Sequence, residues 1–350
     1  MGKTCWEIQK KKSIVSIWKI LLRNFFGLGI LFSPSLLQAV EITPFYTQNQ
    51  SPLVQIFGLP SIGNPSVLPP RKADVRMILD YASNYAEDSN PRENILLDGE
   101  SARITLDARF GISRRFEAGV AIPYLIEGGG FLDSFIIDYH NTFGFPQGGR
   151  DQAPRNRLLY QYQKDGRELL KINQSGQGIG DIQFMGGFQL YESPAKPSQA
   201  IALRISLKLP TGDSNQLHGS GSTDLALWIT AGDDYEVAIG CLALFGAAGI
   251  MGMTRGNILP DQQRNAVGFG SLGAGWSPAR WLALKVQASG HTAFYKDSAL
   301  RELNAKSVQL TVGGTFAFTD SIALDLGITE DVIVKTAPDV VFHFALRGRF

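Results

Sequence analysis

Cysteine and long apolar runs are scarce in this sequence, and both absences limit what the protein can be. Of its two cysteines, Cys5 and Cys241, the first lies in a segment that we expect to be removed, which excludes an intramolecular disulfide. Beyond that segment no stretch approaches 18 uncharged apolar residues, so no transmembrane helix is predicted. The net charge of +1 gives no indication of nucleic acid binding. No metal or other cofactor is predicted, because no metal-ligand spacing relates the four histidines, His140, His218, His291 and His343.

The first 39 residues have the three parts of a secretory signal peptide. A basic stretch comes first, the apolar run Phe25–Leu37 follows, and Ala39 supplies a small residue at the cleavage position. The alternative is a single membrane anchor, but this run is shorter than the roughly 20 apolar residues that span a bilayer. We therefore predict a signal peptide over 1–39, with cleavage before Val40.

The last eleven residues, 340–350, form the most informative strand pattern. Successive side chains of a strand point to opposite faces, so one face is apolar and the other is cationic, with His343, Arg347 and Arg349. This pattern resembles the terminal strand of bacterial outer-membrane β-barrels, whose final Phe is part of the signal read by the barrel-assembly machinery. The resemblance assigns that assembly signal to the apolar face, namely Phe342, Phe344, Leu346 and Phe350.

Twelve strands are assigned in all, counting the terminal strand and two less regular stretches named below, and the other nine alternate clearly between apolar and polar residues. In a clear example, Ile205 and Leu207 oppose Arg204 and Lys208. Residues 235–247 and 263–276 are also assigned as strands, although Gly and Ala blur their two faces. If an exported protein spans the membrane with amphipathic strands and has no transmembrane helix, its strands must form a closed barrel, because an open sheet edge is not tolerated in lipid. The fold class predicted for 72–350 is an all-β, transmembrane antiparallel up-and-down β-barrel of about twelve strands in the bacterial outer membrane.

The lengths of the connections test this prediction independently. Short turns are expected at 113–115, 192–197, 232–234, 277–280 and 319–320. Longer loops are expected at 86–99, 126–177, 212–221, 249–262, 296–305 and 330–339. Short periplasmic turns that alternate with long outer loops are typical of outer-membrane barrels, and they place both chain ends in the periplasm. The Pro-, Asn- and Gln-rich residues 40–71 do not alternate, and they lie either in the periplasm or in the lumen.

The 126–177 connection is too long to be a simple link. After the glycines 128–130, an apolar periodicity predicts an amphipathic helix over 131–144, and residues 156–172 read as a hairpin through Asp165-Gly166. One interpretation makes the helix a gate that turns its aromatic face to the barrel mouth. The other packs it on the hairpin or on the outer-leaflet surface. The gate residues would be Phe131, Phe135, Tyr139 and Phe143.

If the apolar faces point to lipid, the opposite faces line the lumen. Twelve strands lie between the filled eight-stranded barrels and the open sixteen-stranded porins, so the bore is either filled or water-filled. Carboxylate pairing of the cations at 204, 208, 285 and 347 would indicate a closed barrel, whereas an exposed gap would indicate transport. The predicted pore-lining residues are Arg76, Asp80, Arg103, Asp107, Arg109, Glu117, Asp181, Arg204, Lys208, Asp224, Lys285, His291, Asp325, His343, Arg347 and Arg349.

Two classes of outer-membrane enzyme are the catalytic alternatives for this sequence. A phospholipase needs a Ser–His pair oriented by a third polar group, and His218 lies near Ser220 and Ser222. A protease needs carboxylates and a His in the outer loops, which Asp133, Asp138 and His140 could supply. Both patterns are common composition, so the chain is predicted not to be an enzyme.

Several motifs resemble known outer-membrane families. GIGDIQFMGGFQLY (178–191), ISLKLPTGD (205–213) and GSGSTDLALWITAG (219–232) are similar to outer-membrane channels of the phenol-degradation MetA type. FLDSFIIDYHNTFGFPQGGR (131–150) and the terminal strand resemble a Gram-negative outer-membrane family known as a domain of unknown function. The first resemblance implies passage of a hydrophobic or aromatic compound.

The sequence therefore predicts a monomeric outer-membrane barrel that passes a small solute, with the 131–144 helix as gate and the charged lumen as filter. The expected partners are outer-membrane lipid, the barrel-assembly machinery and the solute. The alternative is a closed barrel, structural or surface-binding, without transport.

Overall fold

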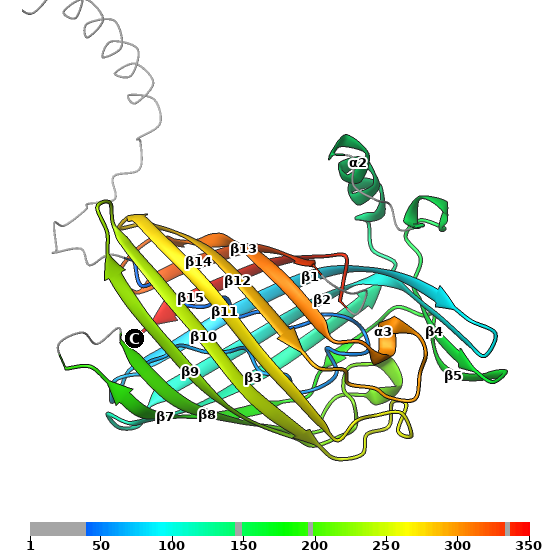
Figure 1. Ribbon diagram of the computed structural model, residues 1–350, viewed down its shortest axis with the longest axis horizontal. Coiled ribbons are helices and arrows are strands. Elements are labelled where there is room, and N and C mark those ends of the chain that lie inside the picture. Colours follow the sequence, from blue (N-terminus) through cyan, green and yellow to red (C-terminus); the bar gives the residue numbers. More distant parts are fainter. Residues whose placement is uncertain (1–39, 144–148, 195–198, 333–336) are drawn as a thin grey trace, which may run out of the picture. The chain divides into compact units, whose positions relative to one another are not determined.

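Twelve antiparallel strands close into a barrel in the computed structural model (Figure 1), which confirms the predicted fold class. The structure describes residues 40–143, 149–194, 199–332 and 337–350, so the predicted signal peptide lies outside the described residues. The wall strands are β1 (Ala73–Ser89), β2 (Glu93–Gly111), β3 (Phe116–Gly128), β7 (Gln183–Glu192), β8 (Ala200–Lys208), β9 (Asp224–Glu236), β10 (Cys241–Met253), β11 (Ala266–Ala279), β12 (Leu282–His291), β13 (Ser307–Ala317), β14 (Ile322–Asp331) and β15 (Val340–Arg349).

Each wall strand pairs with its neighbours in the chain, and β3 pairs with β7 across the long insertion. The first and last strands close the wall in a register that runs from Asp74 opposite Arg349 to Ser83 opposite Val340. Closure satisfies the backbone groups of every wall strand, which a sheet with open edges could not do in lipid.

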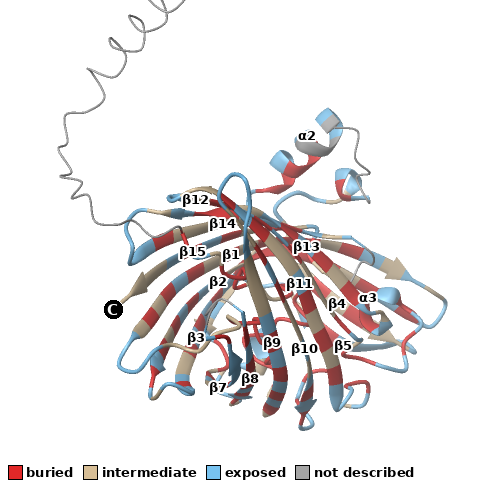
Figure 2. Ribbon diagram, turned by 60° about the vertical axis from the view of Figure 1, so that its left-hand side comes forward, coloured by how far each residue is buried: buried red, intermediate tan, exposed pale blue. Residues whose placement is uncertain are grey.

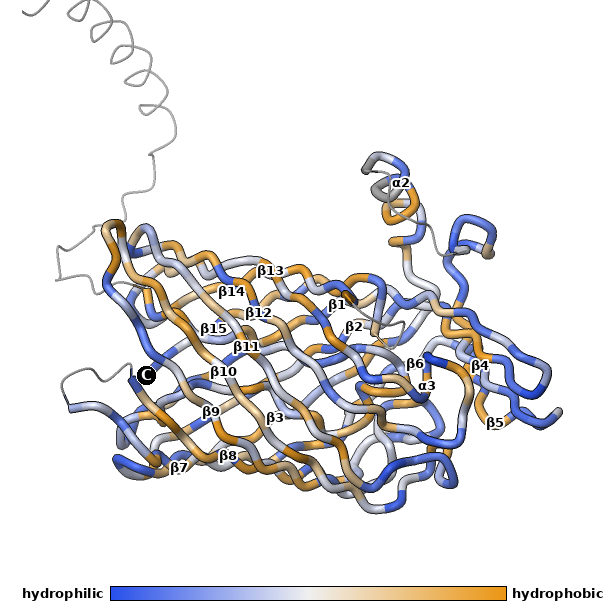
Figure 3. Tube along the Cα trace, in the orientation of Figure 1, coloured by the Kyte–Doolittle hydropathy of each residue, from blue (hydrophilic) through white to orange (hydrophobic). Residues whose placement is uncertain are grey.

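The predicted alternation of faces appears as alternating burial along the strands (Figure 2). In β8, Ile205 and Leu207 are exposed on the outside, whereas Arg204 and Lys208 are buried on the inside. Hydropathy alternates in the same way along the trace (Figure 3). The outside is therefore an apolar belt, and the lumen receives the charged side chains.

The two ends of the barrel differ in their connections. One end, here the short-turn end, has turns at 112–115, 237–240, 280–281 and 318–321, and there the Ala73 N–H donates to the Phe350 carbonyl at 3.0 Å. The other end, the long-loop end, carries the elements of the insertion and α3 (Figure 1). These elements are α2 (Asp133–Phe143), η1 (Arg150–Gln152), β4 (Leu159–Lys164), β5 (Arg167–Ile172), β6 (Gly176–Ile179), η2 (Ser214–Gln216) and α3 (Arg301–Asn304).

Several predicted boundaries are wrong; for example, β11 continues to Ala279, so the turn expected at 277–280 lies at 280–281. The turn expected at 232–234 lies at 237–240, so the strand expected at 235–247 is β10, Cys241–Met253. Gly and Ala dominate β10 and present too little side chain to mark its faces. The loop expected at 86–99 is the protruding part of the β1–β2 hairpin, with a turn at 90–92. The hairpin predicted within 156–172 is present as β4 and β5.

Among the described residues no helix is long and apolar enough to cross a membrane.

Candidate functional site: the occupied lumen

Residues 40–69, here called the luminal segment, run through the inside of the barrel (Figure 1). The segment contains no strand and adds no ladder to the wall, so it is not a thirteenth strand. A rising arm, 40–50, leads from the short-turn end to an apex at 51–57, and a returning arm, 58–69, leads back. The sequence was compatible with either the periplasm or the lumen for these residues, and the structure places them in the lumen.

The rising arm follows β12 and is bound by its side chains. The Phe45 N–H donates to Gln287 Oε1 at 2.9 Å, and Lys285 Nζ lies 4.0 Å from the centre of the Phe45 ring. Further along, Asn49 Nδ2 donates to His291 Nε2 at 2.9 Å. These are polar and cation–π contacts, so the arm is held by directional bonds more than by apolar packing.

Tyr46, on the same rising arm, lies between two guanidinium groups of the barrel wall. Arg76 and Arg109 each lie 5.8 Å from its ring centre, and its hydroxyl donates to Asp107 at 3.0 Å. The ring therefore fills the space between two cations that would otherwise repel one another.

The apex of the luminal segment enters an apolar core at the long-loop end. The rings of Phe57 and Phe294 stack at 4.7 Å, and the Tyr295 hydroxyl donates to the Leu53 carbonyl at 3.0 Å. The same core includes Tyr160 and Tyr162 of β4, which are completely buried. The β4–β5 hairpin and the outer loops therefore seal the lumen over the apex.

At Gly58 the returning arm approaches the wall most closely. Its N–H donates to Asp224 at 2.7 Å, and Lys208 Nζ donates to the Ile56 carbonyl at 3.3 Å. A Cβ atom at Gly58 would lie 2.8 Å from Lys208 Cβ, closer than such atoms approach, so glycine allows this contact.

Arg204 binds the part of the returning arm that is nearer to the short-turn end. One of its nitrogens lies 2.5 Å from Glu117 Oε1, and another donates to the Asn64 carbonyl at 2.5 Å. Glu117 in turn accepts the Leu68 N–H at 2.7 Å. One buried ion pair therefore supplies both a donor and an acceptor to the segment.

The charged residues predicted to line the pore are on the inner face, and most of them are paired with one another. Lys208 pairs with Asp181 at 2.6 Å and Lys285 with Asp325 at 3.1 Å. On the terminal strand, His343 Nδ1 lies 2.6 Å from Asp80. The criterion set from the sequence is met at 204, 208 and 285 but not at 347, because Arg347 forms none of the described ion pairs, so a transport role for these residues stays a prediction.

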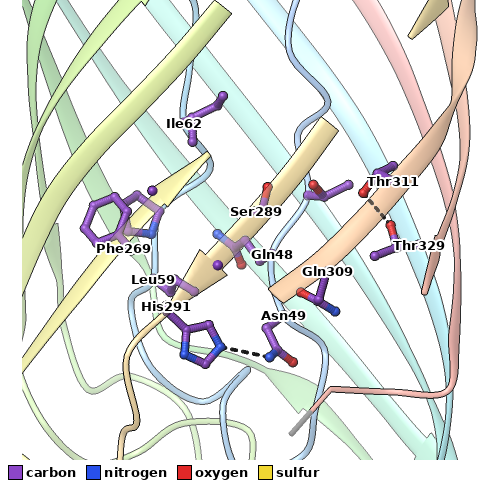
Figure 4. Close-up of a pocket in the computed structure, with 14 residues that line it drawn as sticks. Gln48, Asn49, Leu59, Ile62, Phe269, Ser289, His291, Gln309, Thr311 and Thr329 are labelled. Atoms are coloured by element: carbon purple, nitrogen blue, oxygen red, sulfur yellow. Dashed lines mark hydrogen bonds between the residues drawn. The ribbon is translucent and has the colours of Figure 1, made fainter. Parts of the chain in front are cut away.

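A small cavity remains between the two arms (Figure 4). Its lining includes Gln48, Leu59, Phe269, Ser289 and Gln309. Its volume of about 30 Å³ holds about two water molecules, because one water needs roughly 10–15 Å³. The cavity is therefore too small for an organic solute while the luminal segment is in place.

The helix α2 starts on the outer wall of the barrel and not over its mouth. Glu100, on the outward face of β2, accepts the N–H groups of Phe131 and Leu132 at 3.0 and 2.6 Å. The same carboxylate accepts the hydroxyl of outward-facing Tyr81 at 2.6 Å. A carboxylate at a helix N-terminus satisfies free N–H groups and the helix dipole, so Glu100 fixes α2 outside.

The described contacts do not support the predicted gate, which stays a prediction. Phe131 and Phe135 are exposed, and their rings lie 5.5 Å from Tyr81 and 6.5 Å from Phe342, both on the outward face. The helix buries its aliphatic side, Ile136 and Ile137, instead. Sequence periodicity could not choose between these faces, because both are apolar. The side chains of the other two predicted gate residues, Tyr139 and Phe143, lie outside the described residues.

Arg150 of η1 also holds α2 against the barrel wall. It pairs with Asp133 at 2.8 Å and with Asp339 at 2.6 Å, and it donates to the Ser83 hydroxyl at 2.7 Å. These bonds tie α2 to β1 and to the start of β15.

The geometry does not support the two enzyme alternatives. Ser220 Oγ lies 2.5 Å from Lys208 Nζ, and that nitrogen also pairs with Asp181 and Asp224, so the described bonds of Ser220 do not include a histidine base. Burial lowers the pKa of His218, whose Nε2 has no partner among the described residues. Asp133, a candidate of the protease pattern, is engaged by Arg150. No cluster of metal-ligating side chains occurs in the described part of the chain.

A family model described as "Protein of unknown function (DUF3187)" matches residues 25–350. The chain belongs to the DUF3187 family. No curated protein matches the sequence.

Solved structures resemble this DUF3187 protein at low identity. The COG4313 outer membrane channel from Pseudomonas putida F1 is 11% identical, with a TM-score of 0.51 over 82% of this chain and 98% of that chain. The NanC porin is 7% identical, with a TM-score of 0.41 over 79% and 97%. The toluene transporter TbuX of Ralstonia pickettii is 10% identical, with a TM-score of 0.35 over 90% and 97%. The first of these likenesses shows the shared β-barrel fold, and at these identities no more than the fold follows.

Sequence reasoning on this DUF3187 protein missed the binding partners of the luminal segment. One signal was available: residues 40–69 contain a single charged residue, Glu41, whereas the residues before them are rich in lysine and the strands after them are charged. A neutral segment rich in proline and amides cannot form its own core, so its backbone groups need donors and acceptors from another part of the chain.

Proposed function

We propose that this DUF3187 protein is an outer-membrane channel for a small solute and that the luminal segment closes its bore. The observation that carries the proposal is the double passage of residues 40–69 through the lumen. Wall side chains of an eight-stranded barrel fill its interior, but those of this twelve-stranded barrel leave room for two passes of polypeptide.

The size of the bore follows from what it contains. Neighbouring extended chains lie roughly 4.7–4.9 Å apart, so a space that holds two of them is about 10 Å across. Such a bore admits a small organic solute once the segment is displaced. With the segment in place, the space found between its arms accommodates about two waters.

The way in which the segment is held supports a plug that can move. Its arms are bonded mainly through their own backbone groups, as at Phe45, Gly58 and Asn64, to polar side chains of the wall. Water can replace each of these bonds, and the net contribution of one such bond is about 0.5–1.5 kcal/mol. A segment paired into the wall as a strand could not leave without opening the barrel.

Three features support the outer membrane as the location. The barrel is closed, its outside is an apolar belt, and short turns and long loops are segregated to opposite ends. The long-loop end would then face the exterior, and the luminal segment would be inserted from the periplasmic side.

A closed surface-binding barrel is the second candidate. The carboxylate pairing of Arg204, Lys208 and Lys285 favours it, because the charge of each of these cations is already compensated and is less available to a solute. In that case the long-loop end, with its exposed β4–β5 hairpin, would carry the function.

Single-channel conductance in planar bilayers distinguishes the two candidates. The refolded chain from residue 40 is compared with a variant that lacks residues 40–66 and with full-length Gly58→Ala, which loosens the segment without removing it. The channel proposal predicts a nearly silent intact protein, brief openings in Gly58→Ala and steady conductance after deletion. Silence from folded preparations of all three would overturn it and favour the surface-binding barrel.

A further inference from the structure

The luminal segment engages three wall arginines that lack full compensation by wall carboxylates. Among the described ion pairs none includes Arg103 or Arg347, and the third, Arg349, shares its charge with Glu41 of the segment itself. By contrast, Arg204, Lys208 and Lys285 each have a wall carboxylate. Displacement of the segment therefore changes the charge balance at specific positions.

Arg103 is the most unusual of these cations. It is 6% exposed, and Nη1 donates to the Gln55 carbonyl of the luminal segment at 3.0 Å. Of the carboxylates in its vicinity, Asp181 pairs with Lys208, and Asp80, opposite Arg103 on β1, lies 2.6 Å from His343 Nδ1 and forms no described ion pair with Arg103. Burial of a guanidinium whose partner is only a carbonyl oxygen of the segment costs free energy. When that carbonyl leaves with the segment, the N–H group that bound it becomes available to another acceptor.

A second group of cations lies toward the short-turn end. Arg76 and Arg349 both bond to Asp74 at 3.0 Å, and Arg349 also pairs with Glu41. Arg347 donates to the Thr43 hydroxyl of the luminal segment at 3.3 Å. When the segment leaves, it removes Glu41, and among the described ion pairs Asp74 remains the shared partner of Arg76 and Arg349, while Arg347 has none.

These positions form two steps along one wall of the lumen. On β1, Asp80 stands opposite Arg103 and Arg76 stands opposite Arg347. Four residues of a strand separate the two levels, which corresponds to about 13 Å. A permeating solute would meet one arginine group after the other.

We propose that the open channel selects small oxyanions, with Arg103 and Arg347 as the residues that recognise them. The planar guanidinium fork matches the two oxygens of a carboxylate or phosphate group, and the Gln55 carbonyl occupies the same donor in the closed state. The proposal rests on the channel function proposed above. The proposal specifies only the charged group of the solute, and the rest of the solute can be aromatic or aliphatic.

Ion selectivity of the full-length chain tests this proposal. Reversal potentials are measured across a potassium chloride gradient in the Gly58→Ala background, and again with potassium acetate and potassium phosphate to separate the two oxyanion classes. Anions are expected to permeate more readily than potassium. Arg103→Gln should lower that preference about fourfold, the factor that a unit charge about 5 Å from the ion gives in water. Arg347→Gln should have a similar effect and serves as the second variant.

Arg255→Gln is the matched control, because Arg255 pairs with Asp261 in an exposed outer loop. Conductance without anion preference in the Gly58→Ala channel would overturn the oxyanion proposal and leave the channel function intact. The same holds if Arg103→Gln and Arg255→Gln lower the preference equally. Absence of conductance would instead count against the channel itself.

Discussion

The substitution Gly58→Ala tests most directly whether the luminal segment is a gate. Gly58 donates its N–H to Asp224, and a Cβ atom there would lie 2.8 Å from Lys208 Cβ and 3.3 Å from Asp224 Cβ. Both neighbouring atoms belong to the stems of residues whose charged groups are paired with each other. They cannot move aside freely, so the returning arm must shift away from the wall.

The size of the effect follows from the cost of overpacking. One extra carbon atom in a well-packed site costs about 1–3 kcal/mol. The clash exists in the closed state and disappears when the arm leaves the wall, so the substitution destabilises the closed state alone. An energy difference of this size changes a two-state equilibrium by about 5–150-fold. The open probability in planar bilayers should rise by that factor.

Gly252→Ala provides the control for the loss of a glycine. Gly252 is on the outside of β10, and the nearest atom to a Cβ there is a carbonyl oxygen 3.9 Å away. This variant should behave like the parent protein. An unchanged open probability in folded Gly58→Ala, or an equal rise in both variants, would refute the idea that the fit of the returning arm keeps the bore closed.

Other predictions concern the remaining contacts of the structure. The double variant Phe131→Ser, Phe135→Ser should conduct like the parent, because α2 lies on the outer wall; a clear rise in single-channel conductance would restore a gating role. Arg150→Ala leaves Asp133 without its cation, at a cost of about 3–5 kcal/mol, so limited proteolysis should cut the 131–149 insertion faster while the barrel stays folded. Tyr46→Phe removes the hydroxyl bonded to Asp107 but keeps the ring, so openings should become more frequent, at a cost to the closed state of about 1.5–3 kcal/mol. An unchanged opening frequency in Tyr46→Phe would show that the rising arm does not limit opening.

The sequence by itself determined the wall of this protein. Strand side chains alternate by a local rule, so the faces of β8 and the terminal strand could be assigned without knowing their partners. Turn residues and loop lengths then indicated the two different ends. The rule failed where side chains are small, in the Gly- and Ala-rich β10, because nothing in such a stretch marks which face is which.

The tertiary structure decided what occupies the lumen and where the helix lies. Phe45 and Gln287 are 242 positions apart in the chain, and no local pattern relates them. The outward side of α2 was likewise set by Glu100, a residue of a distant strand that accepts the first N–H groups of the insertion. Burial and charge pairing depend on which side chains the closed barrel brings together, and this physical reason explains why the wall could be predicted and its contents could not.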